Sequence, residues 1–203
     1  MVASLGNVRN RREEGCFVAE GTKCVIDTWN SFKCKYLFAT TAWIEQHEKE
    51  LPNAQPIVAK RADMERMSQL STPTQVLAVY EMPQVTFDEN GLSSNLVIAL
   101  DRVQDPGNLG TIIRIADWFG ITDIVCSPET VDVYNPKVVQ ATMGAISRVK
   151  VHYLDLAELI KRNPDIPVYG TFLDGRNIYE TSLTPHGIVV MGNEGQGISD
   201  EIG

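Results

Sequence analysis

The chain has 203 residues, 43% of them hydrophobic, and a formal net charge of −8, which suits one large domain or two small ones with buried cores. No run approaches the roughly 20 apolar residues of a membrane span, and charged residues replace the apolar region of a signal peptide, so a cytoplasmic protein is predicted. Four scattered cysteines and three separated histidines predict neither a disulfide framework nor a metal site.

Charge is distributed unevenly along the chain. Residues 1–80 carry 10 Lys+Arg against 9 Asp+Glu, whereas residues 81–203 carry 8 against 17. The acidic average argues against nucleic-acid binding, which usually requires a basic surface. The near-neutral first part could still present a local basic face, although dispersed, solvated charges explain it equally well.

Residues 1–80 are predicted to form a small α/β domain. Short apolar runs at Cys24–Ile26, Tyr36–Ala39 and Val76–Tyr80 alternate with helix-like stretches at Trp43–Glu50 and Asp63–Leu70. Residues 81–94 are rich in Pro, Gly, Asn and Ser, which interrupt any periodic pattern, so this segment is predicted to be a linker.

Residues 95–203 are predicted to form a parallel sheet covered by helices on both faces. The apolar strand candidates are Leu96–Leu100, Asp123–Cys126, Val149–Tyr153, Val168–Phe172 and Ile188–Met191; the helical patterns between them are Leu109–Phe119, Lys137–Met143 and Leu156–Arg162. Such folds bind ligands at the carboxyl ends of their strands, which directs attention to the loops after Leu100, Phe172 and Met191.

The segment after Leu100 leads into an amphipathic helix. Asn108 stands at a predicted N-cap, and the predicted apolar face consists of Leu109, Ile112, Ile113, Ala116 and Phe119. Arg114 projects roughly 160° from this face, at about 100° per residue, so it could meet a ligand or solvent. A pairing with Asp117, three residues further on, is the alternative.

The segment after Met191 has three glycines within six residues, Gly192, Gly195 and Gly197. Glycines allow the main chain to approach a ligand closely, which suits an adenosine or a phosphate, although a tight turn would use the same residues. The chain lacks Gly-x-Gly-x-x-Gly, a P-loop, Gly-x-Ser-x-Gly and His-Glu-x-x-His, so it shows no signature of a dinucleotide fold, a P-loop enzyme, a serine hydrolase or a zinc protease.

These segments together resemble the signatures of the SpoU family of SPOUT methyltransferases. Asp105, Pro106, Asn108, Gly110 and Arg114 match Asp-Pro-x-Asn-x-Gly followed by the helical arginine, and residues 192–195 match the Gly-Asn-Glu-Gly loop. Residues 135–145 are similar to the family's intervening Pro-Lys stretch, and residues 15–21 are similar to its substrate-binding domain, which resembles ribosomal protein L30e.

The resemblance implies an RNA 2′-O-ribose methyltransferase that uses S-adenosylmethionine, with a trefoil knot and a homodimer whose active site lies near the subunit interface. RNA is the implied partner, with ribosomal RNA preferred to transfer RNA, and neither a metal nor a membrane is implied. The implied cofactor-binding residues are Thr171, Phe172, Leu173, Gly192, Asn193 and Gly195, and the implied catalytic residues are Asn108, Arg114 and Glu194.

The reaction gives these residue types a physical role. The family's mechanism treats the arginine as a proton acceptor, but a guanidinium stays protonated at working pH. We therefore expect Arg114 to clamp an RNA phosphate and stabilise the developing alkoxide, while Glu194 holds the guanidinium and Asn108 fixes the loop.

One departure from the family's pattern bears on activity. The family has a third segment with a Ser-Leu-Asn-Val core, whereas this sequence stops at residues 199–203, so the knot is expected to be incomplete and cofactor binding weak. The alternatives are a SpoU-like protein that binds RNA without methylating it, and an unrelated nucleotide-binding α/β protein.

Overall fold

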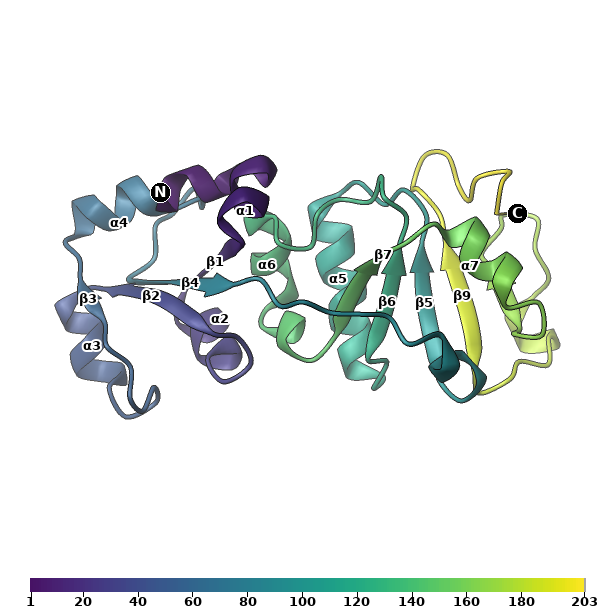
Figure 1. Cartoon of the computed structure of the whole chain (residues 1–203), viewed down its shortest axis with the longest axis horizontal. Helices are drawn as coiled ribbons and strands as arrows, with labels where there is room; N and C mark the ends of the chain where they lie inside the picture. Colours follow the sequence, from purple (N-terminus) through teal and green to yellow (C-terminus); the bar gives the residue numbers. More distant parts are fainter. Residues whose placement is uncertain (203) are drawn as a thin grey trace. The chain divides into compact units, whose positions relative to one another are not determined.

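The computed structural model describes residues 1–202, and these form two compact units (Figure 1). Unit 1 comprises residues 1–84 and 132–148, and unit 2 comprises residues 85–131 and the chain from residue 149 onward. No helix among the described residues is long and apolar enough to span a membrane. Each unit is built on its own sheet.

Unit 1 has a four-stranded mixed sheet with the order β1–β4–β2–β3, in which only β2 and β3 are parallel. Its strands are β1 (Cys16–Glu20), β2 (Cys34–Ala39), β3 (Ile57–Val58) and β4 (Val76–Glu81). Its helices are η1 (Val2–Gly6), α1 (Val8–Glu14), α2 (Thr22–Thr28), α3 (Thr41–His47), α4 (Arg61–Met67), α6 (Pro136–Thr142) and η3 (Ala145–Ser147). Leu5, Val18, Met64 and Leu77 lie in its core.

The alternation of apolar runs with helices predicted for the first domain is wrong at one place. The apolar run Cys24–Ile26 lies in helix α2, while Cys16–Glu20, for which no strand was predicted, forms the buried strand β1. Gly21, with a φ of 91°, separates that strand from the helix. A run of three apolar residues fits both the helical and the strand periodicity. The turn at Gly21 marks where the strand ends and the helix begins.

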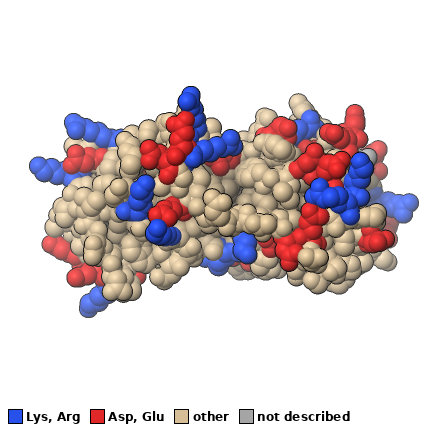
Figure 2. Space-filling view, viewed as in Figure 1, with Lys and Arg blue, Asp and Glu red and all other residues tan. Residues whose placement is uncertain are grey.

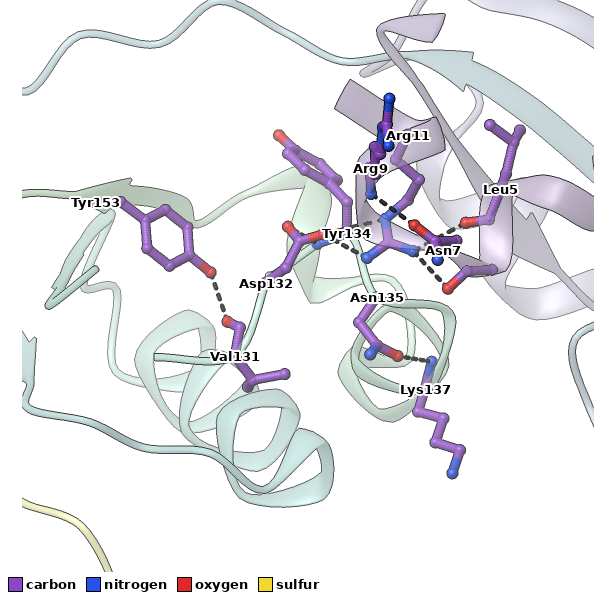
Figure 3. Close-up of polar contacts among 11 residues, drawn as sticks. Leu5, Asn7, Arg9, Arg11, Val131, Asp132, Tyr134, Asn135, Lys137 and Tyr153 are labelled. Carbon is purple, nitrogen blue, oxygen red and sulfur yellow. Dashed lines mark hydrogen bonds and ion pairs between the residues drawn. The ribbon is translucent and has the colours of Figure 1, made fainter. Parts of the chain in front are cut away.

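Residues 132–148 pack with unit 1, although the predicted division placed them inside a continuous domain of residues 95–203. The guanidinium of Arg11 is 1% exposed and donates from Nε to Asp132 Oδ2 at 3.0 Å (Figure 3). Its Nη1 donates to the carbonyl oxygens of Leu5 at 2.8 Å and Gly6 at 2.9 Å. The ring of Tyr134 lies 4.6 Å from that of Phe17, centre to centre. A partly buried ion pair and an aromatic contact therefore hold this segment in unit 1.

Unit 2 has a five-stranded sheet with the order β7–β6–β5–β9–β8, and every pairing is parallel (Figure 1). Its strands are β5 (Leu96–Leu100), β6 (Asp123–Cys126), β7 (Lys150–Tyr153), β8 (Val168–Gly170) and β9 (Gly187–Met191). Its helices are η2 (Glu89–Ser93), α5 (Pro106–Trp118), α7 (Leu156–Arg162) and η4 (Ile178–Glu180). The predicted parallel α/β sheet is confirmed.

Helix α5 begins three residues earlier than predicted. Its N-cap is Asp105, whose Oδ1 accepts the Asn108 N–H at 2.8 Å, and Pro106 occupies the first turn. Proline presets the helical φ and has no N–H to leave unpaired, so Asp-Pro starts the helix before Asn108 can cap it. The cap role predicted for Asn108 is therefore wrong, and its side chain is available elsewhere.

The apolar face of α5 is only partly buried. Leu109, Ile113 and Ala116 are buried, as predicted, but Phe119 is 74% exposed and its neighbour Trp118 is 85% exposed. Large exposed apolar side chains on one helix face are typical of an interaction surface.

The pair between the buried Arg11 and the partly buried Asp132 predicts a large loss of stability in unit 1 when the carboxylate is removed. Asp132→Asn leaves a buried guanidinium without its counter-charge, so the opening free energy of β1 and β4 amides should fall by about 3 kcal/mol. Hydrogen exchange measures this quantity. Glu13→Gln is the control, because the Arg9–Glu13 pair is exposed and should change the same amides by under about 0.5 kcal/mol. Equal small effects of both changes would contradict the account.

Candidate functional site

A cavity of about 660 Å³ opens at the carboxyl ends of β5 and β9 in unit 2. One wall comes from the start of α5 and the loop before it, and the other comes from the glycine-rich loop after β9. The lining residues are Val103, Gln104, Asp105, Asn108, Thr111, Ile112, Met191, Gly192, Asn193, Glu194 and Gly195. Its volume lies in the range of small-molecule sites.

Gly192 allows the loop after β9 to fold back on itself. A Cβ at this position would lie 2.1 Å from the carbonyl carbon of Gly197 and 2.3 Å from the nitrogen of Ile198. Both are backbone atoms, so no side-chain rotation could relieve the clash. Only glycine fits here, which gives the glycine-rich pattern a structural reason.

The side chain of Asn193 holds this loop in shape. Its Oδ1 accepts the N–H groups of Gly195 at 2.9 Å and Gln196 at 3.1 Å, and its Nδ2 donates to the carbonyl of Arg102 at 2.8 Å. Asn193 and Gly197 also exchange two backbone hydrogen bonds. The amide is occupied by the protein itself, so Asn193 lines the cavity mainly as a positioning residue.

Asp101 and Arg102 also support the loop, and neither role was predicted from the sequence. Asp101 is 2% exposed, and its Oδ2 accepts the Ser199 N–H at 2.7 Å. Arg102 has a φ of 56°, and its N–H donates to Ser127 Oγ at 2.9 Å. A non-glycine residue in this conformation is strained, and such strain is often found beside functional sites.

Asn108 and Glu194 meet at the cavity. Asn108 Nδ2 donates to Glu194 Oε2 at 3.1 Å, although the two residues are 86 positions apart. The helix start at Asp105 places Asn108 one turn before Thr111 and Ile112 on the same face. Thr111 and Ile112 were not predicted, but their spacing from Asn108 is a helical i, i+3 and i+4 pattern that could have identified them.

The charge of the lining favours a cationic ligand. Asp105 and Glu194 contribute carboxylates, and none of the lining residues within the described part of the chain is a lysine or arginine. Phosphate groups would be repelled here, whereas a positive centre such as a sulfonium would be attracted. This observation disfavours the nucleotide-binding alternative for this cavity.

The remaining predicted site residues lie outside the cavity lining. Arg114 is exposed and makes no hydrogen bond or ion pair within residues 1–202, so a pairing with Asp117 is absent. Thr171 donates from both N and Oγ1 to the carbonyl of Val190, at 3.1 and 3.2 Å, which places it beside β9. Phe172 is 51% exposed, and Leu173 is fully exposed.

Three of the four cysteines offer no nucleophile near neutral pH. Burial raises the pKa of the Cys24 thiol to about 12 and that of Cys34 to about 11, and it also raises the pKa of Cys126. None of the three lines the cavity. Among the described residues, no group of His, Cys, Asp and Glu side chains could hold a metal ion.

Comparison with known proteins identifies the family. Residues 95–203 match the SpoU rRNA Methylase family. The chain belongs to this family. Residues 1–78 match the MRM3-like substrate binding domain, which covers most of the continuous part of unit 1. In this SpoU family member, the cavity therefore lies within the methylase region.

Curated relatives of this SpoU chain are named as rRNA methyltransferases. A 23S rRNA (guanosine-2′-O)-methyltransferase of Bacillus subtilis is 33% identical over 65% of this chain and 53% of its own length. The mouse mitochondrial rRNA methyltransferase 3 is 30% identical over 70% of this chain and 36% of its own length. These matches thus span about half, or less, of the length of those relatives.

Solved structures share the whole architecture. A TrmH-family protein from Porphyromonas gingivalis is 36% identical, with a TM-score of 0.86, over 99% of this chain and 81% of its own. An AdoMet-bound rRNA methyltransferase from Sinorhizobium meliloti is 28% identical, with a TM-score of 0.83, over 99% and 79%. Solved proteins of both descriptions are therefore similar to this chain over nearly its whole length.

The two cavity glycines should respond differently to substitution. Gly192→Ala places a Cβ against backbone and should lower the melting temperature by several degrees, because such overpacking typically costs about 1–3 kcal/mol. Gly195→Ala is the matched control, since its Cβ would approach only Asn193 Oδ1, at 3.7 Å. Calorimetry measures both changes, and equal melting temperatures would show that the loop is not closed as described.

Proposed function

We propose that this chain transfers a methyl group from S-adenosylmethionine to a ribose 2′-hydroxyl of ribosomal RNA. The observation that carries the proposal is a glycine-walled cavity, lined by carboxylates and without lysine or arginine, in the methylase region of a SpoU protein. The names of its relatives favour ribosomal over transfer RNA as the substrate. The predicted cytoplasmic location remains an expectation.

The cavity suits S-adenosylmethionine in shape and charge. Gly192 lets the main chain of the loop line the cavity without side-chain obstruction, and Met191, Ile112 and Val103 provide apolar surface. The carboxylates of Asp105 and Glu194 favour the positive sulfonium. When bound, S-adenosylmethionine would supply an electrophilic methyl group for ribose O2′, with S-adenosylhomocysteine as the leaving group and the hydroxyl proton passing to solvent.

The residues of the chain contribute mainly positioning. Asn193 and Asp101 hold the loop before any ligand arrives, which lowers the entropic cost of an in-line approach. Asn108 fixes Glu194 in its place beside the cavity. Thr171, Phe172 and Leu173 lie next to the end of β9, and we propose that they contact the cofactor from that side.

We propose that Arg114 acts across a homodimer. It lies on α5 beside Ile115 and Trp118, which are 47% and 85% exposed, and one turn after the cavity-lining Thr111, at the edge of the cavity stripe. The exposed apolar face of α5, formed by Ile115, Trp118 and Phe119, continues the cavity-lining stripe of Asn108 and Ile112. Packing of this face on a second copy would bring Arg114 near the partner's cavity, where its guanidinium could clamp an RNA phosphate and stabilise the alkoxide.

Transfer of a tritiated methyl group to unmodified 23S rRNA transcript tests the function. We expect wild-type transfer and a loss of roughly 100-fold or more for Asn108→Ala and for Arg114→Ala, with Arg114→Lys also impaired because lysine lacks the planar fork. Arg9→Ala and Arg9→Lys are the controls, since this exposed arginine lies in unit 1, pairs with Glu13 and has no proposed contact with the cofactor or the dimer face. RNA binding without any transfer would favour the alternative of a SpoU-like RNA-binding protein.

The dimer predicts a change in mass when the exposed face of α5 is altered. Trp118→Glu should convert a species of twice 22.5 kDa to one of 22.5 kDa in light scattering, because a charge in an apolar interface is costly. Tyr179→Glu changes an aromatic residue that is 95% exposed on η4 and should leave the mass unchanged. A wild-type protein that is monomeric at tens of micromolar would contradict this part of the proposal.

A further inference from the structure

A second cavity, of about 500 Å³, lies in unit 1. It is found where β2 ends and β4 begins, since Thr40 directly follows β2 and Gln75 directly precedes β4. The segment of residues 72–75 forms one wall, and Arg61, Met64 and Glu65 of α4 form another. None of these residues lines the cavity between α5 and the Gly192 loop.

The rim of this cavity keeps hydrogen-bonding groups free. Gln75 Oε1 accepts the Thr40 hydroxyl at 3.3 Å, but Gln75 Nε2 and the Thr72 hydroxyl have no partner among residues 1–202. Arg61 Nε donates to Glu65 Oε1 at 3.1 Å, and both of its Nη groups remain without a partner within the same range. Donors and acceptors therefore surround the opening.

The interior of this cavity is apolar. Met64 is 2% exposed and forms part of the unit 1 core, and Pro73 and Ala42 add further apolar surface. Apolar surface with a few polar groups at its edge can hold a small planar ligand, and an unstacked base is read through hydrogen bonds to its edge and can stack on an arginine plane such as that of Arg61. A guanidinium at the rim adds a group that prefers phosphate.

The charge of the two units points to unit 1 as the place for a polyanion. Unit 1 carries 12 lysines and arginines against 11 acidic residues, whereas unit 2 carries 6 against 15. On the face shown in Figure 2, positive and negative side chains alternate over unit 1 without a continuous basic patch. On this face, contact with RNA would depend on a specific pocket and not on a broad basic surface.

We propose that the unit 1 cavity receives one unstacked nucleotide of the RNA substrate. The base packs on Pro73 and Ala42, Thr72 and Gln75 read its edge, and Arg61 binds the adjacent phosphate. This inference rests on the proposed function for its ligand, because RNA is the substrate that the methylase would present. It assigns unit 1 a defined contact that helps to select the nucleotide to be modified.

Two exposed arginines allow a matched test. Arg61 and Arg9 each pair through Nε with a glutamate four residues on, at 3.1 and 2.7 Å, and their side chains are 92% and 83% exposed. Arg61→Glu and Arg9→Glu thus make the same charge change in the same setting within unit 1. Affinity for unmodified 23S rRNA transcript should fall about tenfold for Arg61→Glu and less than about twofold for Arg9→Glu. Thr72→Val should weaken binding about fivefold with no change of charge.

Backbone amide spectra locate the contact and distinguish binding of an RNA strand from binding of a free nucleotide. Titration with the single-stranded oligonucleotides A12 and U12 should shift the amides of residues 72–75, and free AMP or UMP should shift the same amides at much higher concentration. Equal losses for Arg61→Glu and Arg9→Glu, or shifts confined to residues outside the cavity, would overturn the proposal. Binding of free nucleotides without oligonucleotides would also overturn it, in favour of a small-molecule site.

The affinity of each variant for S-adenosylmethionine separates this inference from the proposed function. It should match that of the wild type, because the cofactor cavity lies in unit 2. A wild-type protein that methylates RNA, combined with unaltered RNA binding by Arg61→Glu and Thr72→Val, would refute the pocket and leave the methylase standing. Absence of cofactor binding and transfer in the wild type would instead refute the proposed function.

Discussion

The candidate site depends on the close approach of Gly192 to the backbone of Gly197 and Ile198, where no side chain can be accommodated. This approach turns the chain back at the end of β9, so that residues 192–195 form one wall of the cavity. Ile198 then packs against the core of unit 2, so the far end of the loop is anchored by apolar burial. The cavity is thus formed by a backbone constraint and does not depend on a flexible lid.

The polar contacts of the loop explain how distant parts of the chain meet there. Asn193 bonds to Arg102, Ser199 bonds to Asp101, and Asn108 bonds to Glu194, which joins the loops after β5 and β9 at three points. Parallel strands bring their carboxyl ends to one edge of a sheet, so these residues become neighbours although about 90 positions separate them. Little reorganisation is then required when a ligand binds.

Much of unit 2 could be predicted because its strands are apolar runs bounded by turns, and Leu96–Leu100 and Asp123–Cys126 match their predicted bounds. The position of Asn108 could not be predicted from capping preference alone, since Asp105 and Pro106 compete for the same role. The packing of residues 132–148 with unit 1 was also out of reach. It depends on an ion pair between Arg11 and Asp132, 121 positions apart, and local patterns carry no information on such a contact.

Sequence motifs correctly predicted several residues that line the cavity, but they did not predict what each side chain does there. Gly192, Asn193 and Glu194 do line one cavity, but the hydrogen bonds of Asn193 show a residue that supports the loop. Arg114 lies off that cavity, and its proposed role requires a second copy of the chain. Asp101 and Arg102, which carry buried contacts and backbone strain, belong to no pattern that could be read beforehand.

The most direct measurement is an isotope-edited NOE experiment with S-adenosylmethionine that carries a ¹³C-labelled methyl group on sulfur. If the cavity between α5 and the Gly192 loop holds the cofactor, the labelled methyl protons should show NOEs to the side-chain methyl groups of Thr111 or Ile112. NOEs only to residues outside the cavity lining, or no saturable binding, would contradict the account.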